Sequence, residues 1–575
     1  MVILRLLLLC LSMLGFVLFL NKKYRIDLAF APALSVSFIL VIIFLSGIIG
    51  ILSWIVYVLL ALGVALFVWM LIQKPATNWK AIFTNPALIF LTVCAIYLFI
   101  RFNNRVLYSY DDFSHWGTIV KTMLLSNALP NAENSFLMFQ SYPPGSACWI
   151  YFVARILGAK EGLYFFAQGI LALSFLATLF SFYGKRPKID LLFPVVGSVL
   201  LYTYVLDPNC LGVDALLAAA GLAAALAVYR YRKSLTKRFL FILPLVCAPL
   251  LIKNSGVFFS LLPVLLGFYY LNEQKKQSAR KKWIAAIALV VVPLVVLLFW
   301  RQHVATAFDT GLATKHALSA QNFSSVWQTN KSSALQMLTI ILKLMINPLT
   351  NHTIIVLGGF AVLIAADWFL RRDRETNKHS LELILVLFLC TLLYQIGIAC
   401  MYLLSMPAAE FFYQNGGDYF RYNSTMVGFL CGVLLAHFGE RNPAAVEETR
   451  AAKASPWVLR AGVLAILLVC LVPSSQLKTL SPGYRTELET RIEQLQAAIQ
   501  EQQVPSGGSY FVKASVDDVD FAGHLFRYQF FSRDVTTTTD PVDSAEIGEI
   551  ASFYTAYINW GTDDFKIYTG AAESE

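Results

Sequence analysis

Charge is scarce in this 575-residue chain, and the scarcity excludes an ordinary soluble fold. Charged residues make up 14% of the sequence and hydrophobic residues 58%, whereas soluble domains carry about 25% charged residues. A water-exposed surface cannot be built from so few charges, so most of the chain is expected to lie in lipid. The mean hydropathy of +0.63 agrees with this conclusion.

Several patterns that would indicate other classes of protein are also absent. The nine cysteines form no Cys-x-x-Cys pair and have no metal-ligand spacing, which excludes a disulfide framework. The sequence contains no P-loop, no Gly-rich dinucleotide turn and no Gly-x-Ser-x-Gly elbow. The apolar segment 6–20 is followed by Asn21-Lys22-Lys23 where small cleavage-site residues would stand, so we expect a retained helix and not a signal peptide.

The charges that are present divide the chain into two unlike parts. Residues 476–575 carry 7 Lys and Arg against 16 Asp and Glu, whereas the rest of the chain has a net charge of +19. A basic membrane part with an acidic tail makes nucleic acid an unsuitable partner. Basic loops at the cytoplasmic face of a membrane explain the high pI better.

Fourteen segments have the apolar length that a membrane-spanning helix needs. They are 4–20, 27–46, 51–72, 82–100, 161–183, 190–206, 212–229, 239–252, 255–271, 283–300, 353–370, 381–404, 422–438 and 457–473. With the N-terminus outside, the cytoplasmic loops hold 25 Lys and Arg and the opposite loops hold 11. The positive-inside rule therefore predicts this orientation for a multi-pass protein of the cell (plasma) membrane.

The expected fold is an all-α polytopic membrane protein with about 14 transmembrane helices and a small C-terminal extracytoplasmic α/β domain. The parts are N-terminal transmembrane helices at 1–100, an extracytoplasmic loop with surface helices at 101–160, a transmembrane bundle at 161–473 with outer loops 301–352 and 405–421, and a soluble α/β domain at 474–575. In that last domain we expect an amphipathic helix at 484–502 and strands at 509–514 and 565–568.

An acidic pair stands out in the first large outer loop. Asp111 and Asp112 are adjacent, and His115 follows among aromatic residues at the start of an amphipathic helix. Adjacent carboxylates are expected to raise each other's pKa, which suits a base that deprotonates a hydroxyl. The alternative is that one of the two caps the following helix.

Four cations are predicted on the same outer side: Arg101, Arg105, Lys253 and Arg421. Lys253 interrupts an apolar stretch, where an unpaired ammonium is costly, although it can also reach the interface by snorkelling. For Arg421 the alternative is a surface ion pair with Asp418. Asp207 and Asp214 bracket an outer turn, and helix capping is the role that we expect of both.

Four motifs on this predicted side together resemble a known family. They are Asp111-Asp112, Lys121-Thr122-Met123, Tyr142-Pro143-Pro144-Gly145 and Lys253-Asn254-Ser255-Gly256. In this order they look like the C-type glycosyltransferase (GT-C) superfamily, over residues 100–260 and more weakly over 405–425. Members of that superfamily are polytopic enzymes that take a sugar from a polyprenyl-phosphate carrier and transfer it outside the cytoplasmic membrane.

The resemblance implies roles for particular residues. Asp111 matches the catalytic base, Asp112 would assist it or bind a divalent cation (Mg or Mn), and His115 joins them as a catalytic candidate; the need for a metal stays open. The donor phosphate would be bound by Lys253, Arg421, Arg101 and Arg105, and the substrates by Tyr142 and Tyr422. The implied partners are a polyprenyl-phosphate sugar donor, a glycan, lipid or protein acceptor, and membrane lipids.

Two other functions remain open from the sequence. A transporter or flippase of lipid-linked glycans would place polar residues at helix midplanes and show duplicated halves. A lipid-linked polysaccharide polymerase or ligase would also have a large outer loop, but such enzymes resemble this chain less because they use late Arg and His residues. A purely structural scaffold does not explain an acidic pair beside the bilayer.

Overall fold

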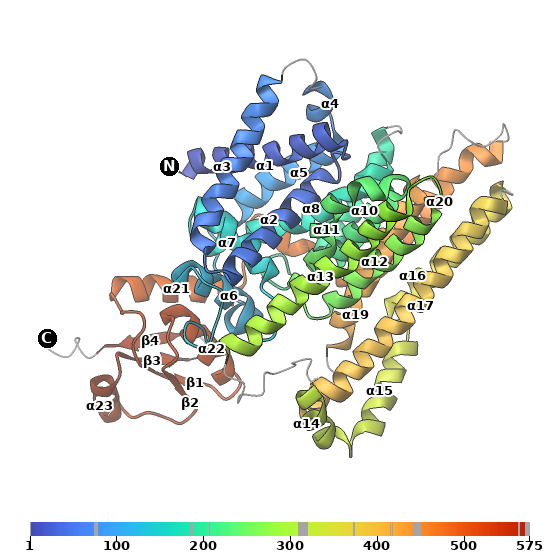
Figure 1. Cartoon of the computed structure of the whole chain (residues 1–575). Coiled ribbons are helices and arrows are strands. Elements are labelled where there is room, and N and C mark those ends of the chain that lie inside the picture. The colour runs from blue at the N-terminus through green and yellow to red at the C-terminus, as the bar shows by residue number, and fades with distance from the viewer. Residues whose placement is uncertain are drawn as a thin grey trace.

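Figure 1 shows the computed structural model of the chain, in which helices fill most of the molecule and a small sheet lies at one corner. The structure describes residues 2–73, 79–183, 188–205, 207–308, 320–371, 374–413, 416, 418–440, 450–561 and 564–569.

The helices fall into three consecutive groups. The first is α1 (Val2–Tyr24), α2 (Ala31–Ile48), α3 (Leu52–Ile72), α4 (Trp79–Phe83), α5 (Pro86–Phe102), α6 (Gly117–Ser126) and α7 (Gly145–Leu157). The second is α8 (Glu161–Leu176), α9 (Leu192–Thr203), α10 (Asp214–Arg230), α11 (Leu235–Ile252), α12 (Gly256–Glu273) and α13 (Ala279–Ala307). The third is α14 (Ala320–Asn330), α15 (Ala334–Ile346), α16 (His352–Arg371), α17 (Arg374–Ser405), α18 (Ala408–Tyr413), α19 (Tyr419–Glu440) and α20 (Arg450–Leu471).

Among the described residues, nine helices are long and apolar enough to cross a membrane. They lie in α1, α2, α3, α8, α11, α12, α13, α16 and α17. The other five segments predicted to span are also helical, as α5, α9, α10, α19 and α20. The helical membrane fold predicted from the apolar runs is therefore confirmed, with nine candidate spans and several shorter apolar helices.

Helix α10 lies at the centre of the bundle, in contact with α8, α11, α12 and α19. Its small residues permit this packing. A Cβ on Gly221 would lie 2.8 Å from the Cβ of Phe259, and a Cβ on Gly432 of α19 would lie 2.1 Å from Leu222. This close packing holds the first residue of α10 against the neighbouring helices.

The loop 101–160 contains two helices, as expected, but the interpretation of the second, α7, as a surface helix is wrong. In α7 twelve of the thirteen residues are buried, and the helix packs on α1, α2, α6, α8 and α11. A Cβ on Gly145 would lie 2.3 Å from the Leu251 carbonyl oxygen, so the backbones approach closely. The helix is therefore enclosed by its neighbours in the fold.

The two later segments that are predicted to be outer loops also contain helices. In the expected loop 301–352, α13 continues to Ala307 and the helices α14 and α15 follow, while the segment 405–421 contains α18. These segments are therefore built from helices where they are described, and α15 is itself a short apolar helix.

The C-terminal part forms a small α/β unit. Its elements are α21 (Glu487–Glu501), β1 (Tyr510–Ala514), α22 (Val519–Phe530), β2 (Val535–Thr538), α23 (Ser544–Phe553), β3 (Ala556–Trp560) and β4 (Phe565–Tyr568). The strand order is β2-β1-β3-β4, with β1 parallel to β2 and β3 and with β3 antiparallel to β4. Alternate residues of β1 are buried, and α22 packs on β1 and β2 as the crossover between them.

This unit is docked on the loop 101–160. Phe113 packs against the rings of Phe521 and Tyr528 on α22, with centroid distances of 5.8 and 5.2 Å. The Lys121 ammonium donates to the Tyr528 carbonyl oxygen at 2.6 Å and lies 4.3 Å from the centre of that ring. The C-terminal unit therefore covers the segment that carries the acidic pair.

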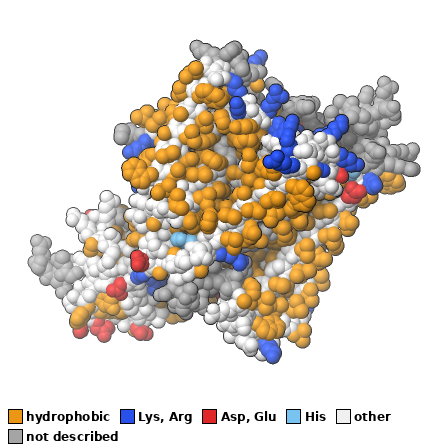
Figure 2. Space-filling model, in the orientation of Figure 1, with side chains coloured by type: hydrophobic (Ala, Val, Ile, Leu, Met, Phe, Trp, Pro, Cys, Tyr) orange, Lys and Arg blue, Asp and Glu red, His pale blue; other side chains and the backbone are white. Residues whose placement is uncertain are grey.

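Charge is distributed unevenly over the surface shown in Figure 2. Basic side chains gather at the helix ends away from the C-terminal unit, and acidic side chains lie mostly over that unit, while the face between is hydrophobic. An apolar band between two charged ends is the pattern that a lipid bilayer requires.

Candidate active site

One arginine gathers three carboxylates from separate parts of the chain. Arg421, in the first turn of α19, donates from Nη2 to Asp111 (2.8 Å) and from Nε to Asp214 (3.1 Å). Its Nη1 contacts Asp418 at 3.3 Å. The Lys253 ammonium binds the same Asp214 carboxylate. The structure thus joins Asp111, Lys253 and Arg421 in one charged cluster, as the sequence predicts for a single site.

Helix ends position the members of this cluster. Lys253 follows α11 in extended backbone, and its carbonyl oxygen accepts the Gly256 N–H at 2.8 Å in the turn that leads to α12. A Cβ on Gly256 would lie 1.7 Å from the Pro249 carbonyl oxygen, so this turn needs glycine. Asp214 is the first residue of α10. Four segments that are distant in sequence therefore meet where their helices begin or end.

Capping, the role expected for Asp214, is wrong. The Asp214 side chain is 2% exposed and binds both Lys253 and Arg421. A signal was present, because Asp214 opens a helix of Ala and Leu in which an unpaired carboxylate would be costly. Asp207 does have a local role, since its Oδ1 accepts the Asn209 N–H at 2.9 Å within the outer turn.

The two carboxyl groups of the acidic pair lie in different environments. Asp111 is 30% exposed and makes no side-chain capping hydrogen bond, whereas Asp112 is fully buried. The Asp112 Oδ1 accepts the Leu211 N–H at 2.8 Å. Burial is the main cause that raises the pKa of Asp112 well above its ordinary value, and the Asp111 charge adds to this effect. Asp111 is therefore the member of the pair that reaches the charged cluster.

A wide helical turn follows Asp111. Residues Asp112–Trp116 form a π-helical turn that is closed by the Gly117 N–H on the Asp112 carbonyl oxygen. A Cβ on Gly117 would lie 2.8 Å from the Asp112 carbonyl oxygen, so the turn favours glycine at this position. Such turns occur frequently at functional sites. The regular 3.6-residue spacing expected from the sequence does not hold until α6 begins.

His115 lies in an aromatic enclosure. Its ring centre is 4.4 Å from that of Trp116, 5.7 Å from Phe139 and 5.3 Å from Tyr142. Neither ring nitrogen has a hydrogen-bond partner among the residues that the structure describes. Burial lowers the pKa of His115 to about 3, so the imidazole is neutral near pH 7. Its direct contacts are therefore with the rings around Tyr142.

The two tyrosines predicted to bind substrate lie beside these groups. The Tyr142 ring stacks on Phe139 at 5.1 Å and packs on Trp116 at 5.9 Å. The Lys253 ammonium lies 4.9 Å from the centre of the Tyr422 ring. Rings beside a charged cluster provide flat apolar surfaces suited to the faces of a sugar or to an isoprenoid chain.

Arg101 and Arg105 lie in another set of contacts. The Arg101 Nη2 donates to the carbonyl oxygens of Thr479 (2.7 Å) and Tyr484 (3.0 Å). The Arg105 guanidinium donates to Tyr484 (2.6 Å) and pairs with Glu489, with both side chains of the pair almost fully buried. The structure therefore places these two arginines at the junction with the C-terminal unit, not in the Arg421 cluster.

The residues around Asp112 do not fit a divalent cation. One Asp112 oxygen already accepts an N–H, and no group of three or more His, Cys, Asp or Glu is arranged to hold a metal ion in the described ranges. A Mg²⁺ ion usually takes one or two protein carboxylates and completes its shell with water and substrate phosphate. Asp112 is fully buried and is open to neither. No step of the chemistry is therefore derived through a metal ion.

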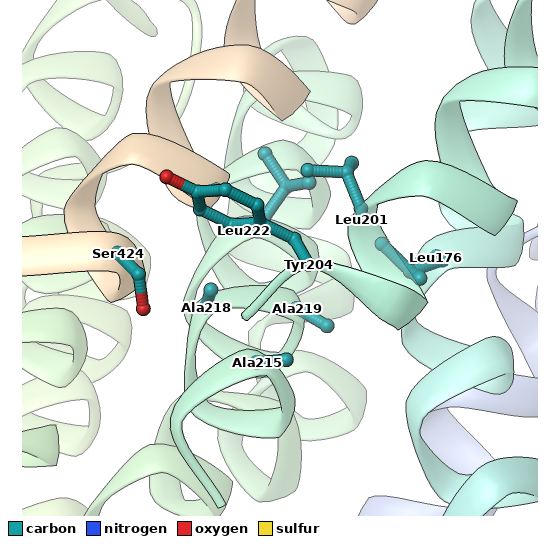
Figure 3. Close-up of a pocket in the computed structure, with 9 residues that line it drawn as sticks. Leu176, Leu201, Tyr204, Ala215, Ala218, Ala219, Leu222 and Ser424 are labelled. Atoms are coloured by element: carbon teal, nitrogen blue, oxygen red, sulfur yellow. The ribbon is translucent and has the colours of Figure 1, made fainter. Parts of the chain in front are cut away.

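A small cavity lies behind the cluster. Its volume is about 10 Å³, and Figure 3 shows Tyr204, Leu201, Leu222 and the start of α10 around it, with Ser424 on the α19 side. This space is about that of one water molecule. It cannot hold a sugar, so the substrate site is expected on the more open side of the cluster, where Asp111 is partly exposed.

No protein-family model matches this chain, and no curated protein matches it. Among solved structures, the chain is similar to ArnT from Cupriavidus metallidurans bound to undecaprenyl phosphate, with 14% identity, a TM-score of 0.43, and coverage of 84% of this chain and 93% of that one. The apo state of the same protein matches with 13% identity and a TM-score of 0.43, and the match covers 82% of this chain and 92% of that one. At this TM-score the likeness concerns the general course of the chain and gives no correspondence between side chains.

Proposed function

We propose that this protein is an integral-membrane glycosyltransferase that moves a hexosyl or pentosyl unit from a polyprenyl-phosphate carrier to an acceptor hydroxyl. The observation that carries the proposal is the contact of the partly exposed Asp111 with Arg421, which Asp214 joins to Lys253. Transfer from a phosphate carrier needs a base for the acceptor and cations for the departing phosphate. Both kinds of group are present in one cluster beside apolar helices.

The proposed step moves one proton and exchanges one bond. The Asp111 carboxylate takes the proton of the acceptor hydroxyl while the acceptor oxygen forms a bond to the anomeric carbon of the sugar. The bond between that carbon and the phosphate oxygen breaks, and its electron pair remains on the polyprenyl phosphate. Lys253 and Arg421 stabilise the negative charge that develops on this leaving group.

The neighbouring residues have supporting roles in this proposal. Asp112, whose burial favours the neutral form, anchors the loop through Leu211 and is not a second base. His115 is neutral and enclosed, so it positions Trp116 and Tyr142 and does not touch the reacting atoms. Tyr142 and Tyr422 present their rings to the sugar or the isoprenoid chain.

The reaction is proposed to take place on the outer side of the cell membrane. The support is the excess of Lys and Arg in the loops predicted to be cytoplasmic, together with the gathering of basic side chains away from the C-terminal unit. An acceptor at that face is a cell-envelope glycan, a lipid or a protein.

A turnover assay tests the proposal. Purified full-length protein in detergent would be incubated with a panel of polyprenyl-phosphate sugars and with glycan, lipid or peptide acceptors. A glycosyltransferase releases polyprenyl phosphate together with a product enlarged by one sugar. A polymerase or ligase transfers a preassembled glycan instead, and a flippase reconstituted in vesicles moves the donor across the bilayer without cleaving it. Intact donor under all conditions, with folded protein, would contradict the proposal.

A further inference from the structure

The charged cluster has too little positive charge for an anionic ligand. Asp111, Asp214 and Asp418 contact Arg421, and among the described residues Arg421 and Lys253 are the cations that pair with them. Asp111 and Asp214 already balance the two cations, so no positive charge is left over before any phosphate arrives. Three of the five N–H donors of a guanidinium are also engaged by these contacts. A phosphate group therefore cannot be bound strongly until a carboxylate separates from Arg421.

Burial decides which carboxylate can do this. The Asp214 side chain is 2% exposed and is held by both cations, so its separation from them would leave an unpaired buried charge. Asp418 lies one turn before Arg421 on the same segment, at 3.3 Å and 39% exposed. That pair is weak and screened by solvent, so its loss or retention changes little.

Asp111 differs from both. Its contact with Arg421 is the shortest of the three measured for that guanidinium, at 2.8 Å, and its side chain is 30% exposed, so water can solvate the carboxylate when the arginine leaves. It also belongs to the loop 101–160, a separate segment from α19.

We propose that the donor phosphate displaces Asp111 from Arg421, so that the base becomes available only when the donor is bound. Without donor, the guanidinium of Arg421 holds the Asp111 carboxylate. With donor, the phosphate occupies the guanidinium, and Asp111 turns to the acceptor hydroxyl with its negative charge uncompensated. This device rests on the proposed glycosyl transfer and adds to it a mechanism by which donor binding activates the acceptor.

Competition for one arginine predicts that removing the catalytic carboxylate strengthens donor binding. The binding of undecaprenyl phosphate to full-length protein would be measured for wild type, Asp111→Asn and Asp418→Asn. We expect Asp111→Asn to bind about three- to tenfold more tightly, because no anion competes for the guanidinium. Asp418→Asn removes the same charge from the same arginine and is expected to change the affinity less than about twofold, since exposed pairs of neighbouring residues contribute little.

A double-mutant cycle separates displacement from a general field effect. In an Arg421→Ala background, Asp111→Asn should no longer change the affinity; Arg421→Gln replaces Arg421→Ala if the alanine variant does not fold. The inference is overturned if Asp111→Asn fails to tighten binding or if the gain persists without Arg421. If folded wild-type protein binds no undecaprenyl phosphate, the proposed function fails and the displacement fails with it.

Discussion

Asp111 is the residue on which the proposed chemistry depends most directly. Asp111→Asn keeps the size of the side chain and removes its charge, so we expect normal insertion and a loss of transfer activity of about 100-fold or more, the size of a general-base contribution. The measurement is the initial rate of sugar transfer at saturating donor. Asp418→Asn is the matched control and should keep activity within a few-fold. Near-normal turnover of the Asp111 variant would exclude this residue as the base.

His115 makes the stability of the loop 101–160 dependent on pH. The folded protein keeps this imidazole neutral down to a pKa of about 3, whereas the unfolded chain takes up a proton near its ordinary value of 6.5. The unfolded state therefore binds more protons in between, and stability falls as the pH is lowered from about 6.5 towards 3. At pH 5.5 the expected loss is on the order of 1 kcal/mol.

This pH effect is measured as the fall in melting temperature between pH 7 and pH 5.5. His115→Gln, which does not titrate, should show a smaller fall than wild type. The control is His379→Gln, because the His379 side chain is 77% exposed and its substitution should leave the slope unchanged. An identical slope in wild type and His115→Gln would show that the enclosure does not keep the imidazole neutral.

The members of the charged cluster could be predicted from the sequence only in part. Asp111, Lys253 and Arg421 were recognisable because each is a charge beside an apolar helix, where an unpaired ionised group is energetically costly. Their partner Asp214 was not, because a carboxylate at the start of a helix is equally well explained as a cap. Whether Asp214 caps its helix or binds cations depends on which distant helix packs beside it. The spacing of nearby residues does not predict that packing.

At the scale of elements, the C-terminal unit and the loop 101–160 are held together by a buried ion pair between Arg105 and Glu489. Arg105→Ala leaves the Glu489 charge unpaired, which costs about 3–5 kcal/mol for such a pair. We expect residues 474–575 to become sensitive to limited proteolysis. The affinity for undecaprenyl phosphate should change less than about twofold, which is a small change in binding free energy.

Arg485→Ala is the control for this experiment. Arg485 pairs with Glu493 near the protein surface, with side chains 38% and 45% exposed, and donates to the Asn104 carbonyl oxygen at 3.2 Å. Because these contacts are exposed, its removal should change the cleavage rate far less than Arg105→Ala does. A large loss of affinity in Arg105→Ala without added proteolysis would instead support the role of phosphate ligand that the sequence predicts for Arg105.

Elements with a strong local period were predicted well. The apolar runs located all fourteen helices, and the alternation in 509–514 and 565–568 located β1 and β4. The environment of α7 was not predicted, because thirteen residues are too few to distinguish a buried helix from an interfacial one. The π-helical turn Asp112–Trp116 was missed for a related reason, since one extra residue in a turn leaves the composition unchanged.

At the scale of the whole molecule, the proposed site requires Asp111 and the C-terminal unit to lie outside the cell. Reporter fusions at Lys275, in an exposed turn between α12 and α13, and at Gln502, after α21, should therefore report opposite sides of the membrane. The readout is the activity of a reporter enzyme that works only in the cytoplasm, fused at each position. The control is a second reporter enzyme that works only outside the cytoplasm, fused at the same positions. Equal signals at the two positions would reverse the orientation and move the cluster to the cytoplasmic side.

The docking of the C-terminal unit on an early loop has a consequence for how the protein is made. Arg105 and Glu489 are 384 residues apart, which at about 5–20 residues per second is roughly 20 to 80 seconds of synthesis. During that interval the segment with Asp111 has left the ribosome, while the surface that holds it does not yet exist. Each newly made molecule therefore passes through a stage in which its early helices can already be inserted while the loop 101–160 is not yet covered.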